Sequence, residues 1–227
     1  SMGVCSRREA DRQIDNGNVT INGKVATLGD QVNDGDDVLF MGQKVVSDAE
    51  PIIIAFNKPK GIVCTAEKRE KNNIIEHINY PERIYPIGRL APARTGLILL
   101  TNQGDLVNKI MKAVNAHEKE YIVTVDKDIT ADFIKNMSSG VYLEELEVTT
   151  RKCRVTKIGP REFSIGLTQG LNRQIRRMCQ TFGYRVRTLK RVRIMNIELG
   201  NLKEDTYRDV NSKEIKELMK MLEGSKN

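Results

Sequence analysis

The spacing of hydrophobic and polar residues predicts a chain of mixed strands and helices. Residues 119–125 alternate between polar and apolar, as a strand with one buried face does. Residues 97–100 form a continuous apolar run, which is typical of a strand buried on both faces. By the same criteria we predict further strands at 52–56, 163–167 and 190–199, and helices at 104–112, 129–137, 172–181 and 212–222. Strands and helices do not alternate strictly, so an α+β fold is favoured over a doubly wound parallel sheet.

A separate pattern occupies the N-terminal part of the chain. Ser6 followed by Glu9 is the signature of a capping box, so we expect a helix to begin there. Residues 18–24 alternate around an Asn-Gly pair, which predicts a tight hairpin. Residues 35–40 form a second hairpin-like stretch that closes the unit.

A linker and a change of charge divide the chain into two predicted domains. Residues 45–51 are mostly polar after two valines and end in proline, as a linker does, so we predict a small domain at 1–48 and a larger one at 52–222. The first holds five basic and eight acidic side chains, net −3, so with +7 for the whole chain the remainder carries +10. This charge favours a polyanionic partner, because neutralised phosphates release counterions. An ordinary basic protein explains the charge equally well.

Composition narrows the class of protein. Among 227 residues, 39% are hydrophobic and 30% charged, which fits a globular protein with a real core. The four cysteines form no C-x-x-C pair, and His77 and His117 fit no metal or triad spacing, so we expect free thiols and no metal. No long apolar run or signal peptide occurs, so we expect a cytoplasmic protein without a membrane segment.

Arginines are densest at residues 171–179, LNRQIRRMC. Arg173, Arg176 and Arg177 follow helical spacings, and a guanidinium there can pair with a phosphate or a buried carboxylate. Residues 185–193 hold five more basic side chains. If this segment is a regular strand, Arg191 and Arg193 share one face. A solubilising surface is the alternative, but such density in adjacent elements favours nucleic acid.

Two turns offer candidate chemistry. The turn at 57–61, NKPKG, presents Lys58 and Lys60, which can meet phosphates. The loop GRLAPARTG at 88–96 lies between predicted rigid elements, where catalysis commonly sits. It contains no carboxylate, histidine, cysteine or lysine, and Thr95 has no evident base. The residues by themselves therefore indicate a basic two-domain protein that binds RNA.

Four motifs in order extend this reading: NKPKGIVCT, GRLxxxxTGLILLTNQGDL, HEKEYIVTV and LTQGLNRQIRRMC. They resemble those of the Rsu family of ribosomal RNA pseudouridine synthases, and the third and fourth are most similar to the RluF type, which acts on large-subunit rRNA. The N-terminal CSRREADRQIDNGNVTINGKVATLGDQVNDGDDV resembles the small RNA-binding domain of the ribosomal protein S4 type, without its usual first helix. This second resemblance implies RNA contacts by Arg7, Arg8 and Arg12.

The family resemblance implies a mixed, mostly antiparallel sheet flanked by helices, with ribosomal RNA in a basic cleft. Uridine becomes pseudouridine without a cofactor or metal, after the target base is flipped out of its stack. An aspartate after Gly-Arg-Leu begins the reaction, either at the anomeric carbon or by taking a neighbouring sugar proton. We also expect a monomer that does not bind membranes.

The resemblance assigns roles to residues of this chain. Arg89 would help to replace the flipped base, and Tyr121 would stack on it. Arg176, or with less weight Arg173, would pair with the aspartate. Three further residues would contact RNA in the cleft: Lys58, Lys60 and Arg177.

The chain departs from the family pattern at the catalytic position, where Ala91 follows Gly-Arg-Leu. A methyl group cannot attack carbon, accept a proton or balance a guanidinium, and a lost partner in a buried ion pair costs about 3–5 kcal/mol. Arg94 makes the loop more positive, and Asp105 is no substitute, because the family carries an aspartate there as well. Two hypotheses follow: a synthase scaffold with impaired activity, or a non-catalytic RNA-binding protein such as a ribosome assembly factor. DNA binding is a weaker third.

Overall fold

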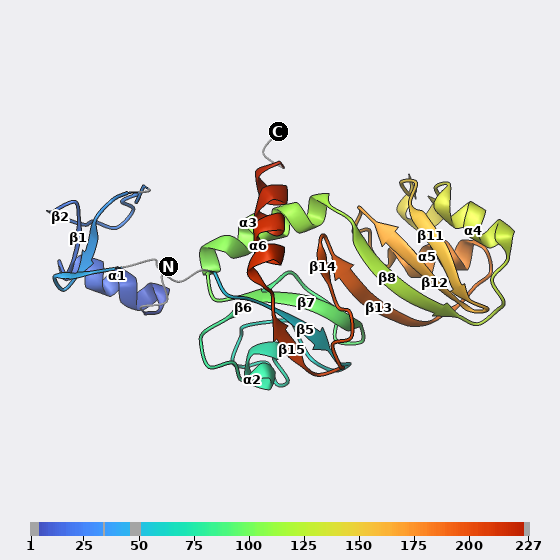
Figure 1. Cartoon of the computed structure of the whole chain (residues 1–227), viewed down its shortest axis with the longest axis horizontal. Coiled ribbons are helices and arrows are strands. Elements are labelled where there is room, and N and C mark those ends of the chain that lie inside the picture. The colour runs from blue at the N-terminus through green and yellow to red at the C-terminus, as the bar shows by residue number, and fades with distance from the viewer. Residues whose placement is uncertain (1–4, 34, 46–50, 225–227) are drawn as a thin grey trace.

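The computed structural model describes residues 5–33, 35–45 and 51–224. Figure 1 follows the chain from a small N-terminal unit to a larger mixed sheet with its helices. Most of the predicted linker at 45–51 lies outside the described residues.

The N-terminal unit combines one helix with a four-stranded sheet of order β2-β1-β3-β4. Its elements are α1 (Arg7–Asp15), β1 (Val19–Ile21), β2 (Lys24–Val25), β3 (Val38–Phe40) and β4 (Gln43–Lys44). Ser6 caps α1 by accepting a hydrogen bond from the Glu9 backbone N–H at 3.2 Å, as predicted. The Glu9 carboxylate is instead engaged by Gln13 and Arg12, so half of the capping box forms. Asn22 and Gly23 both have positive φ, as a two-residue hairpin turn requires.

The larger sheet has nine strands, in the order β11-β12-β8-β13-β7-β5-β15, with β14 added to β13 and β6 to β7. The strands are β5 (Ile53–Lys58), β6 (Tyr85–Ile87), β7 (Thr95–Thr101), β8 (Lys119–Val125), β11 (Arg154–Gly159), β12 (Glu162–Leu167), β13 (Val186–Ile194), β14 (Ile197–Glu198) and β15 (Tyr207–Asp209). Among the described pairs of these strands, β13 with β7 is parallel and the others are antiparallel. The predicted α+β fold with a mostly antiparallel sheet is confirmed.

Helices cover the two halves of this sheet differently. The remaining elements are α2 (Ile74–Ile78), α3 (Gly104–Ala116), α4 (Ala131–Ser138), β9 (Tyr142–Leu143), the 3-10 turn η1 (Glu144–Leu146), β10 (Val148–Thr149), α5 (Gln174–Thr181) and α6 (Ser212–Glu223). In Figure 1, α3 and α6 lie on one side of β5 and β7, and α2 lies on the other. Ile53 and Ala55 of β5 therefore pack with the α3–α6 core, and Ile54 and Phe56 with the α2 core. Coverage of both faces explains the continuous apolar runs.

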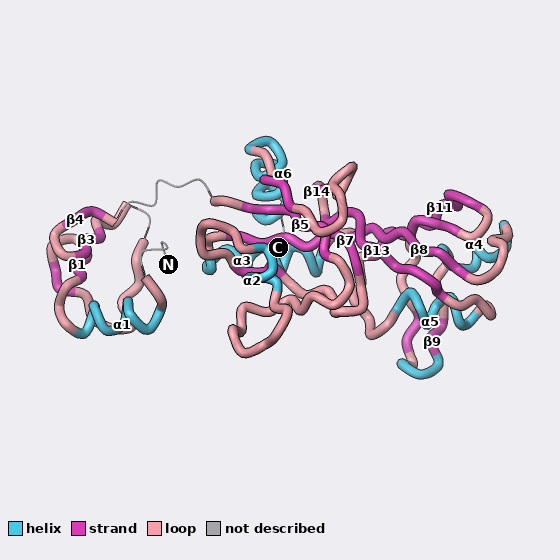
Figure 2. Tube along the Cα trace, turned by 90° about the horizontal axis from the view of Figure 1, so that it is seen from below, coloured by secondary structure: helices cyan, strands magenta, loops and turns pink. Residues whose placement is uncertain are grey.

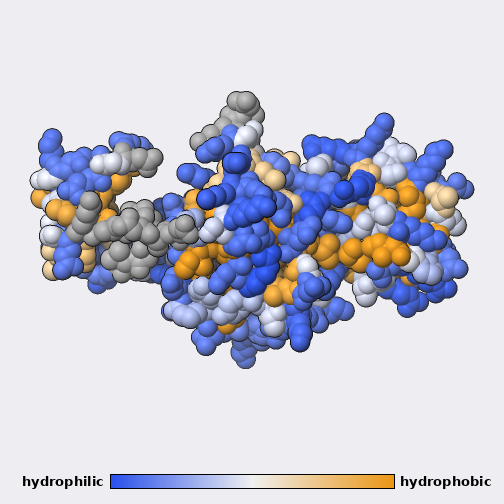
Figure 3. Space-filling model, viewed as in Figure 1, coloured by the Kyte–Doolittle hydropathy of each residue, from blue (hydrophilic) through white to orange (hydrophobic). Residues whose placement is uncertain are grey.

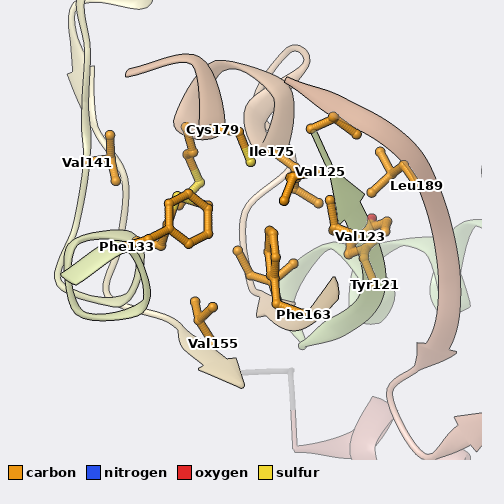
Figure 4. Packing of buried hydrophobic residues seen from close by; sticks show 14 of the residues in the cluster. Tyr121, Val123, Val125, Phe133, Val141, Val155, Phe163, Ile175, Cys179 and Leu189 are labelled. Atoms are coloured by element: carbon orange, nitrogen blue, oxygen red, sulfur yellow. The ribbon is translucent and has the colours of Figure 1, made fainter. Parts of the chain in front are cut away.

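The other half of the sheet, around β8 and β12, is covered on one face. Buried and half-buried residues alternate along β8. The buried face joins α4 and α5 in a core with Phe133 and Phe163 near its centre, as Figure 4 shows. Figure 2 shows α5 and β9 on the same side of the sheet. The predicted alternation at 119–125 is thus confirmed, and Glu120 and Thr124 lie on the face without a helix.

Two predictions for the arginine-rich segments are wrong. Residues 190–199 do not form one strand, because the chain reverses at Met195, which has φ +55°, and β14 pairs back on β13. The pairing of β13 with β8 also shifts register, so that Arg191 lies opposite Tyr121 and Arg193 lies opposite Glu120. Tyr121 and Glu120 are neighbours on β8 and point to opposite faces of the sheet. Their partners Arg191 and Arg193 therefore also point to opposite faces, because a bulge at residue 192 breaks the alternation of β13.

Three general features complete the fold. None of the described helices is long and apolar enough to cross a membrane. The four cysteines are free thiols, as expected. Across the described residues no group of three or more histidine, cysteine, aspartate or glutamate side chains is arranged to hold a metal ion.

Candidate nucleic-acid interface

A row of residues crosses the centre of the large sheet on one face. Lys58 on β5 pairs with Gly96 on β7, Gly96 pairs with Arg191 on β13, and Arg191 pairs with Tyr121 on β8. Directly paired residues project to the same face, and neighbouring strands lie about 4.8 Å apart. The pairing therefore places four residues that are distant in sequence on a line roughly 14 Å long. We call these four residues the central row.

Gly96 is the narrowest point of the central row. Its φ is +112°, and a Cβ atom built there would lie 2.2 Å from the backbone oxygen of Arg191 and 2.6 Å from its backbone nitrogen. Only glycine fits this conformation and this approach. The Nε of Arg191 donates a hydrogen bond to the carbonyl of Leu97 at 2.8 Å. The glycine thus lets β13 and its arginine close on the start of β7.

The loop that contains Ala91 is tied down beside this row. The Cys64 thiol donates to the carbonyl of Leu90 at 3.3 Å. The carbonyl of Pro92 accepts from the Gly61 backbone N–H at 2.8 Å and from Lys58 Nζ at 3.3 Å. These bonds hold the loop against the turn after β5. Ala91 itself is exposed to solvent.

Three basic residues of the large sheet are buried without a carboxylate partner among the described residues. Lys58 is 0% exposed, and Arg191 and Lys119 are each 7% exposed. Over the described part of the chain, none of them forms an ion pair. Burial lowers the pKa of Lys58, and burial followed by the charge of Arg191 lowers the pKa of Lys119. Lys58, which we predicted to contact RNA in the cleft, has its ammonium group under the loop, where it donates to the carbonyls of Pro59 and Pro92.

Three cations lie close enough to the buried Cys64 thiol to affect its pKa. Burial raises its pKa, and the positive charges of Lys58, Arg191 and Arg89 oppose this shift. Arg89 itself is exposed, as is Lys60. The structure therefore brings the predicted Lys58 and Arg89 together with Arg191, whose role the sequence did not single out.

The helix α5 brings a second group of arginines to the loop. Desolvation, followed by the charges of Arg173 and Arg94, lowers the pKa of Arg176. Arg173 is exposed, with φ +50°, and precedes the helix, which starts at Gln174 rather than at the predicted 172. Arg176 thus faces positive neighbours, and no carboxylate of the described residues pairs with it.

Arg177, which we predicted to contact RNA, is bonded to other residues of the chain in this structure. Its guanidinium pairs with Glu145 of η1 and donates to the Asn172 carbonyl at 2.9 Å and to the Asn172 side chain at 3.0 Å. A phosphate would have to displace these acceptors. In this conformation Arg177 links α5 to the β9–β10 hairpin.

Tyr121 lies at the end of a row of core residues on β8. It is 9% exposed and shares its cluster with Ile175 and Met178 of α5. In Figure 4 it lies next to Val123, which pairs with Leu189 of β13. Tyr121 therefore connects the central row to α5, the helix of Arg176, and little of its ring is open in this conformation.

The opposite face of the sheet carries a network that sequence reasoning missed. Arg193 Nε donates to Glu120 at 3.0 Å, and its other nitrogens pair with Glu118 and donate to the Met195 carbonyl at 2.7 Å. Arg154 adds a bond to Glu118 at 3.0 Å. A Cβ on Gly166 would lie 2.5 Å from the Glu118 side chain. The alternating acids of HEKEY were the available signal, because they fall on the face away from Tyr121.

The arginines of α1 form an exposed basic face on the N-terminal unit. Arg7, Arg8 and Arg12 are all exposed, and Arg12 lies 3.2 Å from Glu9. This exposure leaves them accessible to a phosphate backbone. Figure 3 shows that the visible surface of the molecule is hydrophilic over most of its area, with scattered hydrophobic patches.

Comparison with known proteins decides the family. The pattern of the RNA pseudouridylate synthase family matches residues 52–181, and that of the S4 domain matches residues 1–38. This chain belongs to the RNA pseudouridylate synthase family. The predicted resemblance, including the S4 domain, is confirmed.

Similar proteins extend the membership over the whole chain. The dual-specificity RNA pseudouridine synthase RluF of Escherichia coli K12 is 54% identical over 98% of this chain and 77% of its own length. The ribosomal large subunit pseudouridine synthase B of Bacillus subtilis is 32% identical over 99% of this chain and 95% of its own. A crystal structure of a pseudouridylate synthase superposes with a TM-score of 0.65 and 25% identity over 95% of both chains.

Proposed function

We propose that this family member binds ribosomal RNA, with large-subunit rRNA favoured, and does not convert uridine to pseudouridine. The observation that carries the proposal is the group of cations around loop 88–94, which has no carboxylate partner among the described residues. The family pattern places an aspartate after Gly-Arg-Leu, and this chain has Ala91 there. The relatives are named as RNA-modifying enzymes, which supports RNA as the partner.

The arrangement favours binding over catalysis for a physical reason. Isomerisation needs a group that attacks carbon or takes a proton, and general acid–base or nucleophilic work requires a titratable side chain within reach. Ala91 offers none, and Lys58 and Arg191 are donors already bonded to backbone carbonyls. Positive charge without an acid still attracts phosphates.

We assign the residues as follows. Arg89, Lys60 and Arg173 are exposed and would contact the RNA backbone. Tyr121 would stack on a flipped uridine after a small opening of its surroundings. Arg176 would attract the phosphates of the flipped nucleotide. Arg7, Arg8 and Arg12 would add contacts from the S4 unit.

A gain-of-activity experiment tests the catalytic half of this proposal. We expect no pseudouridine when the purified protein is incubated with rRNA fragments and the products are mapped by carbodiimide modification and reverse transcription. Ala91→Asp should produce pseudouridine, because it restores a carboxylate after Gly-Arg-Leu, in the loop whose Arg94 acts on Arg176. Ala93→Asp, which adds the same charge to the same exposed loop, is the matched control and should remain inactive. Product from the unmodified protein would contradict the proposal.

The salt dependence of affinity tests the binding half. With about four to five phosphates contacted, the dissociation constant for an rRNA fragment should rise roughly 100-fold between 50 and 200 mM salt. A DNA duplex of equal length should bind more weakly at each salt concentration. An affinity that does not change with salt would exclude the phosphate contacts.

A further inference from the structure

A pair of tyrosine rings lies at the edge of the large sheet, where β15 runs beside α2 (Figure 1). Tyr207 of β15 and Tyr80, which follows α2, have ring centroids 5.5 Å apart and ring planes at 70°. We call these two rings the aromatic corner. We infer that the aromatic corner, with the carboxylates of Glu82 and Asp209, binds cationic side chains of an arginine- or lysine-rich segment of a partner protein. The inference goes beyond the proposed function, because none of the residues that we assign to RNA takes part.

Strand register explains why the two rings meet. Tyr207 pairs with Phe56 of β5, and Asp209 pairs with Ile54. Phe56 and Ile54 belong to the core under α2, so Tyr207 and Asp209 project to the α2 face of the sheet. Tyr80 packs against the same core. Because β15 ends the strand order, none of the described strands of this sheet covers the outer side of Tyr207, which is 41% exposed.

Contacts behind the aromatic corner hold its two sides together. His77 of α2 bonds to Asp205 at 2.5 Å, and its ring centroid lies 6.1 Å from that of Phe56. The backbone N–H of Asp205 also donates to a carbonyl of β5 at 2.8 Å. The helix is thereby tied to the segment that leads into β15. The two rings are therefore preorganised before a ligand arrives, which lowers the entropic cost of binding.

The geometry of the rings suits a cation. The face of an aromatic ring carries negative partial charge and attracts an ammonium or guanidinium group. Rings at 70° form two walls, so that a cation against one face also lies beside the second ring. A nucleobase can also stack on an exposed tyrosine, so the charge around the rings decides between the two ligands.

Carboxylates surround the aromatic corner. Burial, followed by the negative charges of Asp209 and Glu82, raises the pKa of Tyr80, and no positive charge opposes this shift. Both carboxylates are exposed, and neither forms an ion pair within the described part of the chain. An RNA backbone would be repelled here, whereas an arginine or lysine side chain would gain from the rings and from the carboxylates together.

Two arginines that are close in sequence are engaged elsewhere. Arg83 lies over the ring of Tyr85, 5.4 Å from its centroid, and Arg208 pairs with Glu214 of α6. The aromatic corner is therefore left to a cation from outside the chain. A single exposed contact between a cation and a ring is weak, so we expect a segment with several basic residues. Such segments are common in proteins that bind RNA, which would bring the partner to the same RNA.

Calorimetric titration of the whole protein with short peptides at low salt tests the site. The probe is a capped peptide in which arginine alternates with glycine, and a peptide with glutamate in place of arginine is the reference. Tyr207→Leu should weaken binding of the arginine peptide about tenfold, because leucine keeps an apolar side chain but has no ring face. Tyr207→Phe keeps the ring and should bind within about twofold of the unmodified protein. Asp209→Asn should weaken binding about threefold.

Tyr142→Leu is the matched control, because Tyr142 is 57% exposed on β9, in the half of the molecule that contains α5. It should bind the arginine peptide as the unmodified protein does. Asp209→Asn retains both rings and decides the question if Tyr207→Leu does not fold.

Three results would overturn the site: unchanged peptide binding in Tyr207→Leu, equal binding of the glutamate peptide, or weaker binding of an oligouridine by Tyr207→Leu. The last result would assign the tyrosine to the RNA interface instead. Peptide binding by a protein that has no affinity for rRNA would contradict the proposed function alone.

Discussion

The two faces of the sheet at β8 and β13 place their basic residues in opposite electrical surroundings. On one face, Arg193 and Arg154 are matched by Glu118 and Glu120. On the other, the described cations at the start of β7 have no carboxylate partner. Both acids belong to the HEKEY motif, which also contains Tyr121. They lie on the face opposite Tyr121, where they pair with arginines and stabilise the sheet. The unbalanced face is therefore the one to which we assign RNA binding.

A single residue in the bulge separates these two environments. Arg191 and Arg193 are two positions apart and would share a face on a regular strand. The extra residue between them turns Arg191 toward Tyr121 and Arg193 toward Glu120. One strand thereby places Arg193 in the network with the acids and Arg191 in the central row.

The largest expected effect comes from the contact that assembles the central row. Gly96→Ala should lower the free energy of unfolding by about 3–5 kcal/mol. The new Cβ atom would clash with the Arg191 backbone, and the alanine would have to adopt a positive φ. Gly88→Ala is the control: its φ is +85°, but no atom lies within 4 Å, so about 1–2 kcal/mol is expected. Urea denaturation measures both variants. Equal losses would show that the close approach at Gly96 does not matter.

A smaller loss should follow from removing the balanced arginine. Arg193→Met leaves Glu118 and Glu120 half-buried with their main partner gone, and we expect a loss of about 2–4 kcal/mol after allowing for their partial exposure. Neutralising these acids at low pH should recover part of the loss. A loss under about 0.5 kcal/mol would mean that the network contributes little, as exposed pairs do.

The smallest effect is expected on the unbalanced face. Lys58→Met should change the free energy of unfolding at neutral pH by less than about 1 kcal/mol, because it removes a buried charge and keeps a similar volume. It should also weaken the pH dependence. Burial lowers the pKa of Lys58 in the folded state. The unfolded chain then holds more protons between the folded-state pKa and about 10.4, so stability rises with pH across this window.

Urea titrations from pH 7 to 10.5 measure this slope. The variant should lose part of the rise, and Lys119, whose pKa is also lowered, should account for some of the remainder. Lys60→Met is the matched control, because Lys60 is exposed two residues away. A wild-type slope in Lys58→Met would place the titrating group elsewhere.

Local patterns in the sequence were enough to predict most elements. Thr130 caps α4, the apolar run at 97–100 is buried in β7, and β8 has its predicted bounds. Short or polar elements such as α2, β6, β9 and β15 were not predicted, because two to five residues carry too little periodicity. The motifs named Ala91, Tyr121, Lys58 and Arg176, but gave no sign that Lys58 would be buried.

The sequence by itself determined the family, the basic charge of the larger part, and the absence of a carboxylate in loop 88–96. Only the tertiary structure decided which residues meet there. Strand order sets Lys58, Gly96, Arg191 and Tyr121 side by side, although more than 130 positions separate the first from the third. The physical reason is that local periodicity fixes which face a residue takes within a regular element. Neighbouring strands and a bulge then choose its partners, and both depend on pairing over long distances in the chain.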